Sequence, residues 1–297
     1  MTDRAVASRV QNIWLSAMPG LFVVLWSTGF IGGKLGIPYA PPLTFLALRF
    51  AIVTVLLLIL SFVTSAPWPR SWRKVGHMAV AGLLVQGCYL GGVFTSLAHG
   101  VQAGASSLIV GIQPLLVAAV AGPLLGERVG RAHWIGLVLG LAGVALVVWD
   151  KLSLGLGTPI GMGLSIFALA GMTAGTVYQK RYCADQDLRT GNVVQFAATT
   201  VAVLPLAATF ETMRIDWTPQ FAFALAWLCL VLSLGAISLL YVLIRRGAAS
   251  KVSSLFYMVP PCTAIMAYFL FGETLSPLAL FGMAVAVAGV ALVNFGR

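Results

Sequence analysis

Long apolar stretches, separated by short polar connections, dominate the pattern of side chains along this chain. A helix needs about 20 consecutive, mostly apolar residues to cross the hydrocarbon core of a bilayer. Stretches of about this length recur throughout the sequence, and each predicts a transmembrane helix. The predicted helices cover residues 13–33, 42–64, 75–97, 104–125, 133–149, 157–179, 192–210, 221–244, 252–271 and 277–295. The pattern therefore predicts an all-α integral membrane protein with ten transmembrane helices.

The composition agrees with a membrane protein and excludes a water-soluble globule. Hydrophobic residues make up 60% of the 297 positions and charged residues only 9%, whereas about 25% of a typical soluble domain is charged. Ten spans with short connections use almost the whole length of the chain. We therefore expect no soluble domain.

The basic side chains give the orientation of these helices. They lie mostly in every second connection, and the positive-inside rule then places both the N-terminus and the C-terminus in the cytoplasm. On the opposite side we expect only Lys34, Lys151 and Arg214, while Arg49 falls inside a helix. The net charge of +10 thus indicates acidic membrane lipid as a partner and no nucleic acid. The basic residues assigned to the cytoplasmic side are Arg4, Arg9, Arg70, Arg73, Lys74, Arg128, Arg131, Lys180, Arg181, Arg189, Arg245, Arg246, Lys251 and Arg297.

The second half of the sequence repeats the first. Residues 126–147 align with residues 272–293, and Lys34 aligns with Lys180. We divide the chain into a first repeat, residues 1–150, and a second, residues 151–297, which together form one transmembrane domain.

Each repeat contains five helices, and an odd number inverts the second repeat relative to the first. The charges change sides as this requires, because cytoplasmic Arg131 aligns with Pro277 in an external connection. Two inverted bundles can enclose a site that opens alternately to either side, so the repeat predicts a solute transporter with alternating access.

Each repeat also ends in a proline-containing fourth helix, a Gly-Glu turn and a glycine-rich fifth helix. The residues of this pattern, with two more in the first and second helices, are Trp26, Arg49, Pro114, Gly126, Glu127, Pro261, Gly272 and Glu273. In these features nearly the whole chain resembles the EamA type of the drug/metabolite transporter superfamily, and within it the bacterial exporters of aromatic and other neutral amino acids. The resemblance implies an inner-membrane location and outward transport. Purines, nucleotide sugars and drugs remain alternative cargoes, because fold does not fix function.

Ionisable and amide side chains within spans are candidates for substrate binding, because they are costly in a bilayer. Arg49 could clamp a carboxylate with two parallel hydrogen bonds, or it could be a structural arginine paired with carbonyl groups. Gln86 and Tyr89, at positions i and i+3, share one helix face and could contact a substrate. A helix-to-helix hydrogen bond is the alternative for this pair.

Two prolines mark further candidates. Pro114, preceded by Gln113, and Pro261, four residues after Tyr257, are expected within helices. An interior proline bends a helix and frees a carbonyl group four residues earlier. We therefore predict Pro114 and Pro261 as hinges, and Gln113 and Tyr257 as substrate contacts.

Aromatic and hydroxyl side chains complete the predicted site. Trp26 is a candidate stacking wall for a substrate or a packing residue. Ser106 and Ser107 are equivalent by the repeat to Ser253 and Ser254, and each pair could contact a gate or pack between helices.

Glycine runs in the fifth and tenth helices allow close helix packing. They could act within one chain or between two chains, so a homodimer is possible from the sequence. The glycines are Gly136, Gly140, Gly143, Gly282 and Gly289.

The acidic residues predict how transport is driven. All eight fall in tails, connections or helix ends, so we expect no buried carboxylate that could carry a proton, and hence uncoupled transport. Three histidines near helix ends could titrate, and we expect packing roles for them. The acidic residues are Asp3, Glu127, Asp150, Asp185, Asp187, Glu211, Asp216 and Glu273.

Other chemistries lack their sequence patterns. The four cysteines are scattered singly, which favours neither a disulfide framework nor a metal site. The cluster around Gly32 lacks the spacing of a phosphate-binding loop, and no nucleophile arrangement is recognisable. We therefore expect no cofactor and no enzymatic activity.

Overall fold

The computed structural model describes residues 2–125, 130–236, 239, 256–274 and 276–295, and every regular element in these ranges is a helix. The longer α-helices are α1 (Thr2–Gly36), α2 (Pro42–Val63), α3 (Trp72–Gly82), α4 (Gly91–Ala98), α5 (Ala103–Gly111), α6 (Gln113–Leu125), α7 (Arg131–Ser153), α8 (Pro159–Tyr182), α9 (Leu188–Phe210), α10 (Pro219–Ala226), α13 (Val259–Phe271) and α14 (Pro277–Phe295). Two short 3-10 turns, Ile37–Tyr39 and Phe256–Met258, precede α2 and α13.

Seven helical segments of the described chain are long and apolar enough to cross a membrane. Three shorter apolar helices, Ala103–Val117, Val259–Phe271 and Pro277–Gly289, lie in the remaining expected spans. The prediction of an all-helical membrane protein is therefore confirmed. The number of ten crossings, the inverted repeat and the side of the termini stay predictions.

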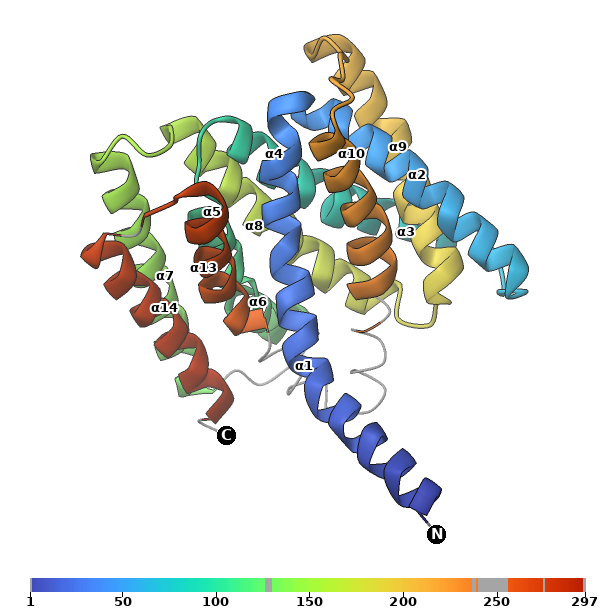
Figure 1. Ribbon diagram of the computed structural model, residues 1–297, viewed down its shortest axis with the longest axis horizontal. Helices are drawn as coiled ribbons and strands as arrows, with labels where there is room; N and C mark the ends of the chain where they lie inside the picture. Colours follow the sequence, from blue (N-terminus) through green and yellow to red (C-terminus); the bar gives the residue numbers. More distant parts are fainter. Residues whose placement is uncertain (1, 126–129, 237–238, 240–255, 275, 296–297) are drawn as a thin grey trace.

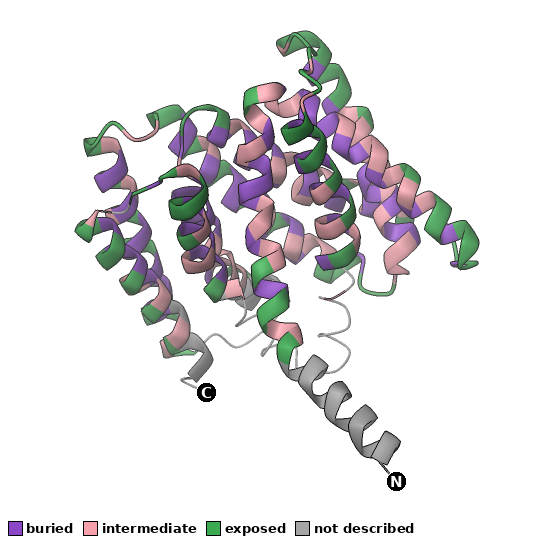
Figure 2. Ribbon diagram, in the orientation of Figure 1, coloured by how far each residue is buried: buried purple, intermediate pink, exposed green. Residues whose placement is uncertain are grey.

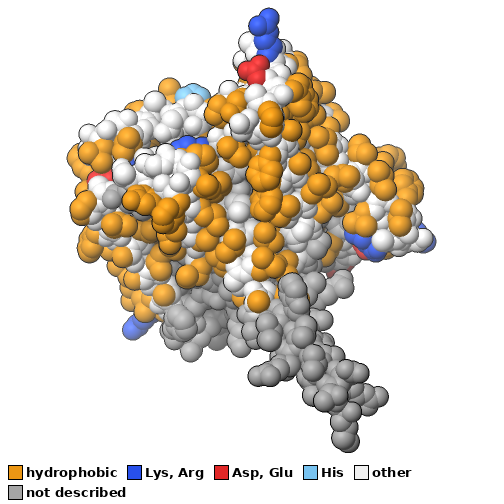
Figure 3. Space-filling model, viewed as in Figure 1, with side chains coloured by type: hydrophobic (Ala, Val, Ile, Leu, Met, Phe, Trp, Pro, Cys, Tyr) orange, Lys and Arg blue, Asp and Glu red, His pale blue; other side chains and the backbone are white. Residues whose placement is uncertain are grey.

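The helices form a bundle with α1 through its middle. In Figure 1, α7 and α14 run side by side at one edge, and α2 packs against α9 at the other. Buried positions face the interior and exposed positions face outward (Figure 2). Large apolar side chains such as Phe62, Val201 and Phe269 are exposed. Hydrophobic side chains are spread over the described part of the side seen in Figure 3, where charged side chains are few. An apolar exterior of this kind suits lipid as the solvent.

The glycine runs act within the chain. A Cβ atom at Gly289 would lie 2.7 Å from the Gly136 carbonyl oxygen and 2.9 Å from the Gly140 nitrogen. A Cβ atom added at Gly282 would lie 2.8 Å from the Gly143 carbonyl oxygen. These glycines of α7 and α14 therefore allow the two backbones to pack closely within one molecule.

Three spans depart from regular α geometry. A π-helical segment, Leu83–Leu90, joins α3 to α4, and a second, Trp227–Ala236, follows α10. The fourth span breaks at Ile112, where α5 ends and α6 begins, two residues before Pro114. The fourth span is therefore interrupted beside Pro114, and the role of Pro114 as a hinge stays a prediction.

Pro261 differs from its expected position. The described part of α13 begins at Val259, after the 3-10 turn, so Pro261 stands in the first helical turn and not in the middle of a helix. Proline is well tolerated there, because the N–H groups of the first turn have no partner within the helix. Pro261 is thus the third residue of α13, and its role as a hinge stays a prediction.

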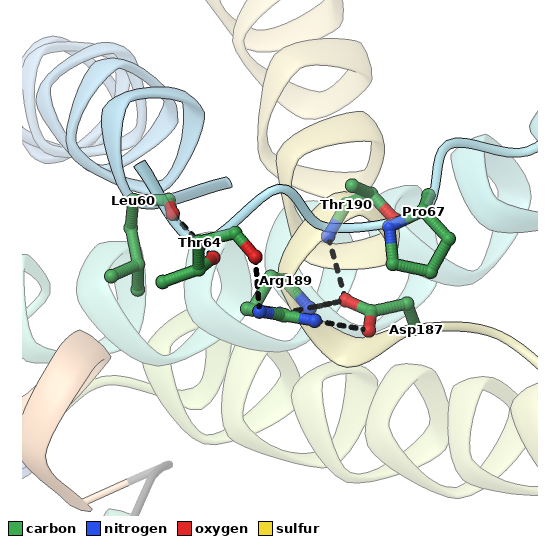
Figure 4. Close-up of polar contacts among 6 residues, drawn as sticks. All are labelled: Leu60, Thr64, Pro67, Asp187, Arg189 and Thr190. Atoms are coloured by element: carbon green, nitrogen blue, oxygen red, sulfur yellow. Dashed lines mark hydrogen bonds and ion pairs between the residues drawn. The ribbon is translucent and has the colours of Figure 1, made fainter. Parts of the chain in front are cut away.

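Side-chain caps fix the ends of α8 and α9. The Thr158 hydroxyl accepts a hydrogen bond from Gly161 N at 3.0 Å. Asp187 accepts from Arg189 N at 2.9 Å, and the Arg189 guanidinium donates to both carboxylate oxygens at 2.9 and 3.1 Å (Figure 4). Thr190 donates to the Pro67 carbonyl at 2.8 Å and ties the loop after α2 to α9. This cluster holds two spans together at one end of the bundle.

The hydrogen bonds from the Arg189 guanidinium hold the pKa of the Asp187 carboxyl below its ordinary value of 3.8. A group with a lower pKa in the folded state stabilises that state at pH values above its unfolded pKa. That contribution is lost as the pH falls through the folded pKa.

Asp187→Ala is expected to lower the stability by about 1 kcal/mol at pH 7, a typical value for a lost helix cap. The difference from wild type should shrink as the pH falls below 3.8. Thr158→Ala removes a cap that does not titrate, so its effect should be the same at both pH values. Thermal unfolding of the detergent-solubilised variants at pH 7 and pH 3 measures this, and an Asp187→Ala effect independent of pH would contradict the prediction.

Candidate functional site

A cavity of about 90 Å³ lies inside the bundle, where the two π-helical segments face α1 and α2. Most of its lining is apolar or aromatic, with a small number of polar groups, which is typical of sites for small molecules. Its lining residues are Trp26, Gly29, Phe30, Arg49, Val85, Gln86, Tyr89, Leu90, Val93, Phe94, Met172, Phe196, Leu232 and Ser233.

Four of the residues predicted to bind substrate meet in this cavity: Trp26, Arg49, Gln86 and Tyr89. They come from α1, α2 and the first π-helical segment. Tertiary structure thus brings together side chains that the sequence separates by up to two spans.

Arg49 is the charged group of this cavity. It is 3% exposed, and one terminal nitrogen, Nη2, donates to the Ser233 hydroxyl at 3.3 Å. The other two guanidinium nitrogens, Nε and Nη1, are buried without a hydrogen-bond partner. A buried N–H group without a partner costs free energy, and the described residues supply no acceptor to these two nitrogens. A carboxylate could accept from either of them together with the second N–H of Nη2, in the paired geometry typical of arginine.

Ser233 supports Arg49 from the second π-helical segment. Its hydroxyl donates to the Leu228 carbonyl at 2.9 Å and accepts from the guanidinium. The sequence analysis missed Ser233, because a serine in an apolar span gives no sign of the helix face on which it lies. The sequence pattern also gives no sign that residues 227–236 form a π-helix. Such segments are frequent at functional sites.

A second, smaller hollow of about 20 Å³ adjoins the cavity. Trp26, Phe30, Tyr89 and Met172 line both. The helices on either side of the break, α5 and α6, border this hollow and contribute the candidates Ser107, Gln113 and Pro114, with Val110 and Gly111. Phe256 of the second 3-10 turn and Val259 of α13 also line it. The two hollows therefore share a wall, and we describe them together as the site.

The polar candidates beside the smaller hollow are already bonded to the protein. Gln113 donates to the Thr176 hydroxyl at 3.1 Å, and Ser107 donates to the Gly104 carbonyl at 2.8 Å. The Trp26 ring also packs edge-on against Phe256, with ring centroids 5.1 Å apart. These residues line the site, but the structure gives each of them a packing role as well.

Of the remaining polar candidates, the structure describes the side chain of Ser106, which does not line either hollow. Ser106 is fully buried and accepts a hydrogen bond from the Ser165 hydroxyl at 3.2 Å, which is helix packing. Ser253 and Ser254 lie outside the described residues, as does the Tyr257 side chain.

Charged groups meet at one end of the bundle, at the C-terminal end of α1. Lys34 forms an ion pair with Glu273, which follows α13. Glu273 also accepts hydrogen bonds from Ala103 N at 2.9 Å and Gly104 N at 3.3 Å, and so caps α5. Lys151 donates to the Thr274 carbonyl at 2.8 Å. We call Lys34, Lys151, Glu273 and Thr274 the end cluster.

The end cluster corrects one expectation from the sequence. Glu273 is 6% exposed and Asp150 is 5% exposed, so two carboxylates are buried although they stand at helix ends. The ends of several helices meet at this point, and a neighbouring helix then covers a terminus that the sequence pattern places in a connection. Of the described acidic residues, none lines either hollow of the site.

Comparisons with known proteins give the family. The model of the EamA-like transporter family matches residues 17–149 and 159–295. A crystal structure of a protein of similar length shares the fold, with a TM-score of 0.65 at 20% sequence identity, covering 93% of this chain and 94% of the other.

Several curated proteins are similar over most of their length. An inner membrane transporter of Escherichia coli K12, YedA, named as uncharacterized, is 26% identical, with 92% of this chain and 88% of YedA covered. A protein of Streptantibioticus cattleyicolor named "Probable terminal-alkyne amino-acid exporter" is 26% identical, with 98% and 94% covered. A protein of Salmonella typhimurium named "Probable amino-acid metabolite efflux pump" is 24% identical, with 93% of each chain covered.

Replacing Arg49 by methionine should leave the unliganded protein as stable as before, or raise its free energy of unfolding by up to about 2 kcal/mol, because unpartnered buried donors are removed. Lys151→Met is the matched control. It removes a buried cation that has a partner and should destabilise the protein. Thermal unfolding in detergent compares the two, and a loss in Arg49→Met as large as that in Lys151→Met would contradict the prediction.

Proposed function

Because this chain belongs to the EamA-like transporter family, we propose that it exports neutral amino acids, aromatic ones included, by alternating access around the central cavity. The chain is a multi-pass transporter of the bacterial inner membrane, as are relatives of the same family. The cargo, the direction and the mechanism are the proposal.

One observation carries the proposed cargo. Two guanidinium nitrogens of Arg49 have no hydrogen-bond partner among the described residues, and they lie in a cavity walled by Trp26, Phe30, Phe94 and Phe196. The guanidinium suits the carboxylate of an amino acid, and the aromatic wall suits an apolar side chain. The names of two relatives, an amino-acid exporter and an amino-acid metabolite efflux pump, support the same class of cargo.

The proposed mechanism uses two inverted five-helix repeats, residues 1–150 and 151–297, with both termini in the cytoplasm. The family model matches two segments of similar length, one in each repeat. A π-helical segment occurs in the third span of the first repeat and in the equivalent span of the second. Both segments border the cavity, which supports a site between two related halves.

The further expectations also belong to this proposal. We propose uncoupled transport, because none of the described acidic residues lines the site. Acidic lipid headgroups are the proposed partners of the basic connections. A possible homodimer and a role in transport without enzymatic activity belong to the same proposal.

Uptake into proteoliposomes tests the cargo. We expect saturable uptake of labelled phenylalanine and tryptophan, weaker uptake of threonine and none of a nucleobase, with no change when a pH gradient is imposed. Arg49→Gln should raise the half-saturating concentration of phenylalanine about 10- to 100-fold, since a hydrogen bond to a charged group contributes about 1.5–3 kcal/mol.

Arg214→Gln is the matched control for that experiment. Arg214 is exposed and lies outside the site, so uptake should be unchanged. Absence of amino acid uptake by folded wild-type protein would refute the proposed cargo. Strict dependence on the pH gradient would refute uncoupled transport and direct attention to the histidines.

The end cluster has a role in the proposed cycle. The positive-inside assignment puts Lys34 and Lys151 outside the membrane, so the ion pair between Lys34 and Glu273 would close the external side of the cavity. By the repeat, these two residues correspond to Lys180 and Glu127 at the cytoplasmic side. Glu127 lies outside the described residues. We propose that equivalent pairs close the two sides alternately.

Lys34→Met should weaken the external closure. In a variant whose four native cysteines are replaced by alanine, a cysteine at Ser107 should react several-fold faster with a membrane-impermeant maleimide added outside the cell. Arg214→Met removes an exposed cation assigned to the same side and should not change the rate. Equal rates in the Lys34→Met and Arg214→Met proteins would refute the closure.

A further inference from the structure

The charges around the site are unbalanced. Of the described residues, Arg49 is the one charged side chain that lines either hollow, and no carboxylate lines them. The salt bridge between Lys34 and Glu273 belongs to the end cluster and lines neither hollow. A bound molecule with one negative charge would therefore neutralise Arg49, whereas a zwitterion would bring a positive charge with it.

We propose that this site binds aromatic or apolar monocarboxylates that lack an ammonium group more tightly than it binds the corresponding amino acids. The inference rests on the proposed function, because it assumes that Arg49 holds the carboxylate of the cargo. Among molecules with a carboxylate, it favours 3-phenylpropionate, arylpyruvates and N-acylated amino acids over free amino acids at the same site.

The first reason is the cost of burying an ammonium group. A buried cation is tolerated when an anion or several hydrogen-bond acceptors surround it. The neutral side chains Gln86 and Tyr89 line the main cavity, but they can supply few acceptors to the three N–H groups of an ammonium. The Ser233 oxygen already accepts from Arg49, and its hydrogen is donated to Leu228.

The second reason is repulsion. In an α-amino acid the ammonium group is two bonds from the carboxylate carbon, so it would lie close to the guanidinium that binds the carboxylate. Like charges at such a distance repel, and burial strengthens this repulsion because the surroundings screen it poorly. A carboxylate with hydrogen, a keto group or an amide at the α position avoids this cost.

The third reason is the shape and polarity of the rest of the site. Beyond Arg49, the walls shared by the two hollows are Trp26, Phe30, Tyr89 and Met172. They suit a flat apolar body that extends from the carboxylate into the second hollow. In the second hollow, the Gln113 amide nitrogen already donates a hydrogen bond to the Thr176 hydroxyl. The far end of the site is therefore mainly apolar in its described lining.

Binding to the purified wild-type protein in detergent at pH 8 tests the inference with four matched probes. They are 3-phenylpropionate, N-acetyl-L-phenylalanine, L-phenylalanine and 2-phenylethylamine, and isothermal titration calorimetry gives each Kd. The probes share a phenyl ring and differ in charge. We expect 3-phenylpropionate to bind at least about tenfold more tightly than phenylalanine, which corresponds to about 1.4 kcal/mol, and 2-phenylethylamine not to bind.

Two variants connect the preference to Arg49. Arg49→Gln should remove tight binding of 3-phenylpropionate, while Arg49→Lys, which keeps the charge but not the paired donors, should retain part of it. Arg214→Gln should leave all four Kd values unchanged. N-acetyl-L-phenylalanine controls for size, because it keeps the α substituent without its charge and should bind more tightly than phenylalanine.

The outcomes separate this inference from the proposed function. Tighter binding of phenylalanine than of 3-phenylpropionate, or measurable binding of 2-phenylethylamine, would overturn the inference and leave amino acid export standing. In that case backbone carbonyl groups at the break between α5 and α6 would be the acceptors for the ammonium. Failure of every carboxylate probe to bind folded protein would overturn both proposals.

Discussion

In a bilayer, every backbone N–H and C=O group has to find its hydrogen-bond partner inside the protein, and the architecture follows from this requirement. Helices meet it within single segments, so the described chain consists of helices with short connections. Irregular backbone is tolerated at membrane depth where it borders a cavity. The two π-helical segments and the break at Ile112 are such places, and they line the two hollows. The departures from α geometry thus mark the site.

The cations Lys34, Lys151 and Arg49 differ in the partners that the described residues give them. Lys34 pairs with Glu273, and Lys151 donates to the Thr274 carbonyl, so the end cluster supplies partners for both. Arg49 has one long hydrogen bond to Ser233 and two nitrogens without a partner. The free energy that Arg49 costs in the empty site would be recovered when an anion binds. This difference distinguishes a residue that holds helices together from one that awaits a ligand.

Part of the site could be predicted because a membrane makes polar residues costly. This is why Arg49, Gln86 and Tyr89 were visible as candidates, and Trp26 with them through the family resemblance. Ser233 and the apolar wall residues Phe196 and Met172 were not visible. Small hydroxyl and apolar residues are the ordinary contents of a span, and hydrophobicity does not reveal which of them face a cavity. The sequence left Ser106 as either a gate contact or a packing residue, and its hydrogen bond with Ser165 supports packing between helices.

The sequence by itself determined the helical membrane class, because lipid selects long apolar segments, and it determined the family, because the repeated Gly-Glu and proline pattern lies along the chain. It also singled out Arg49, since one cation within an apolar span stands out. Only the tertiary structure decided that Glu273 is buried against Lys34 and that Arg49 lacks an anionic partner. Burial and pairing depend on which helix ends and faces meet, and residues far apart in the sequence supply them.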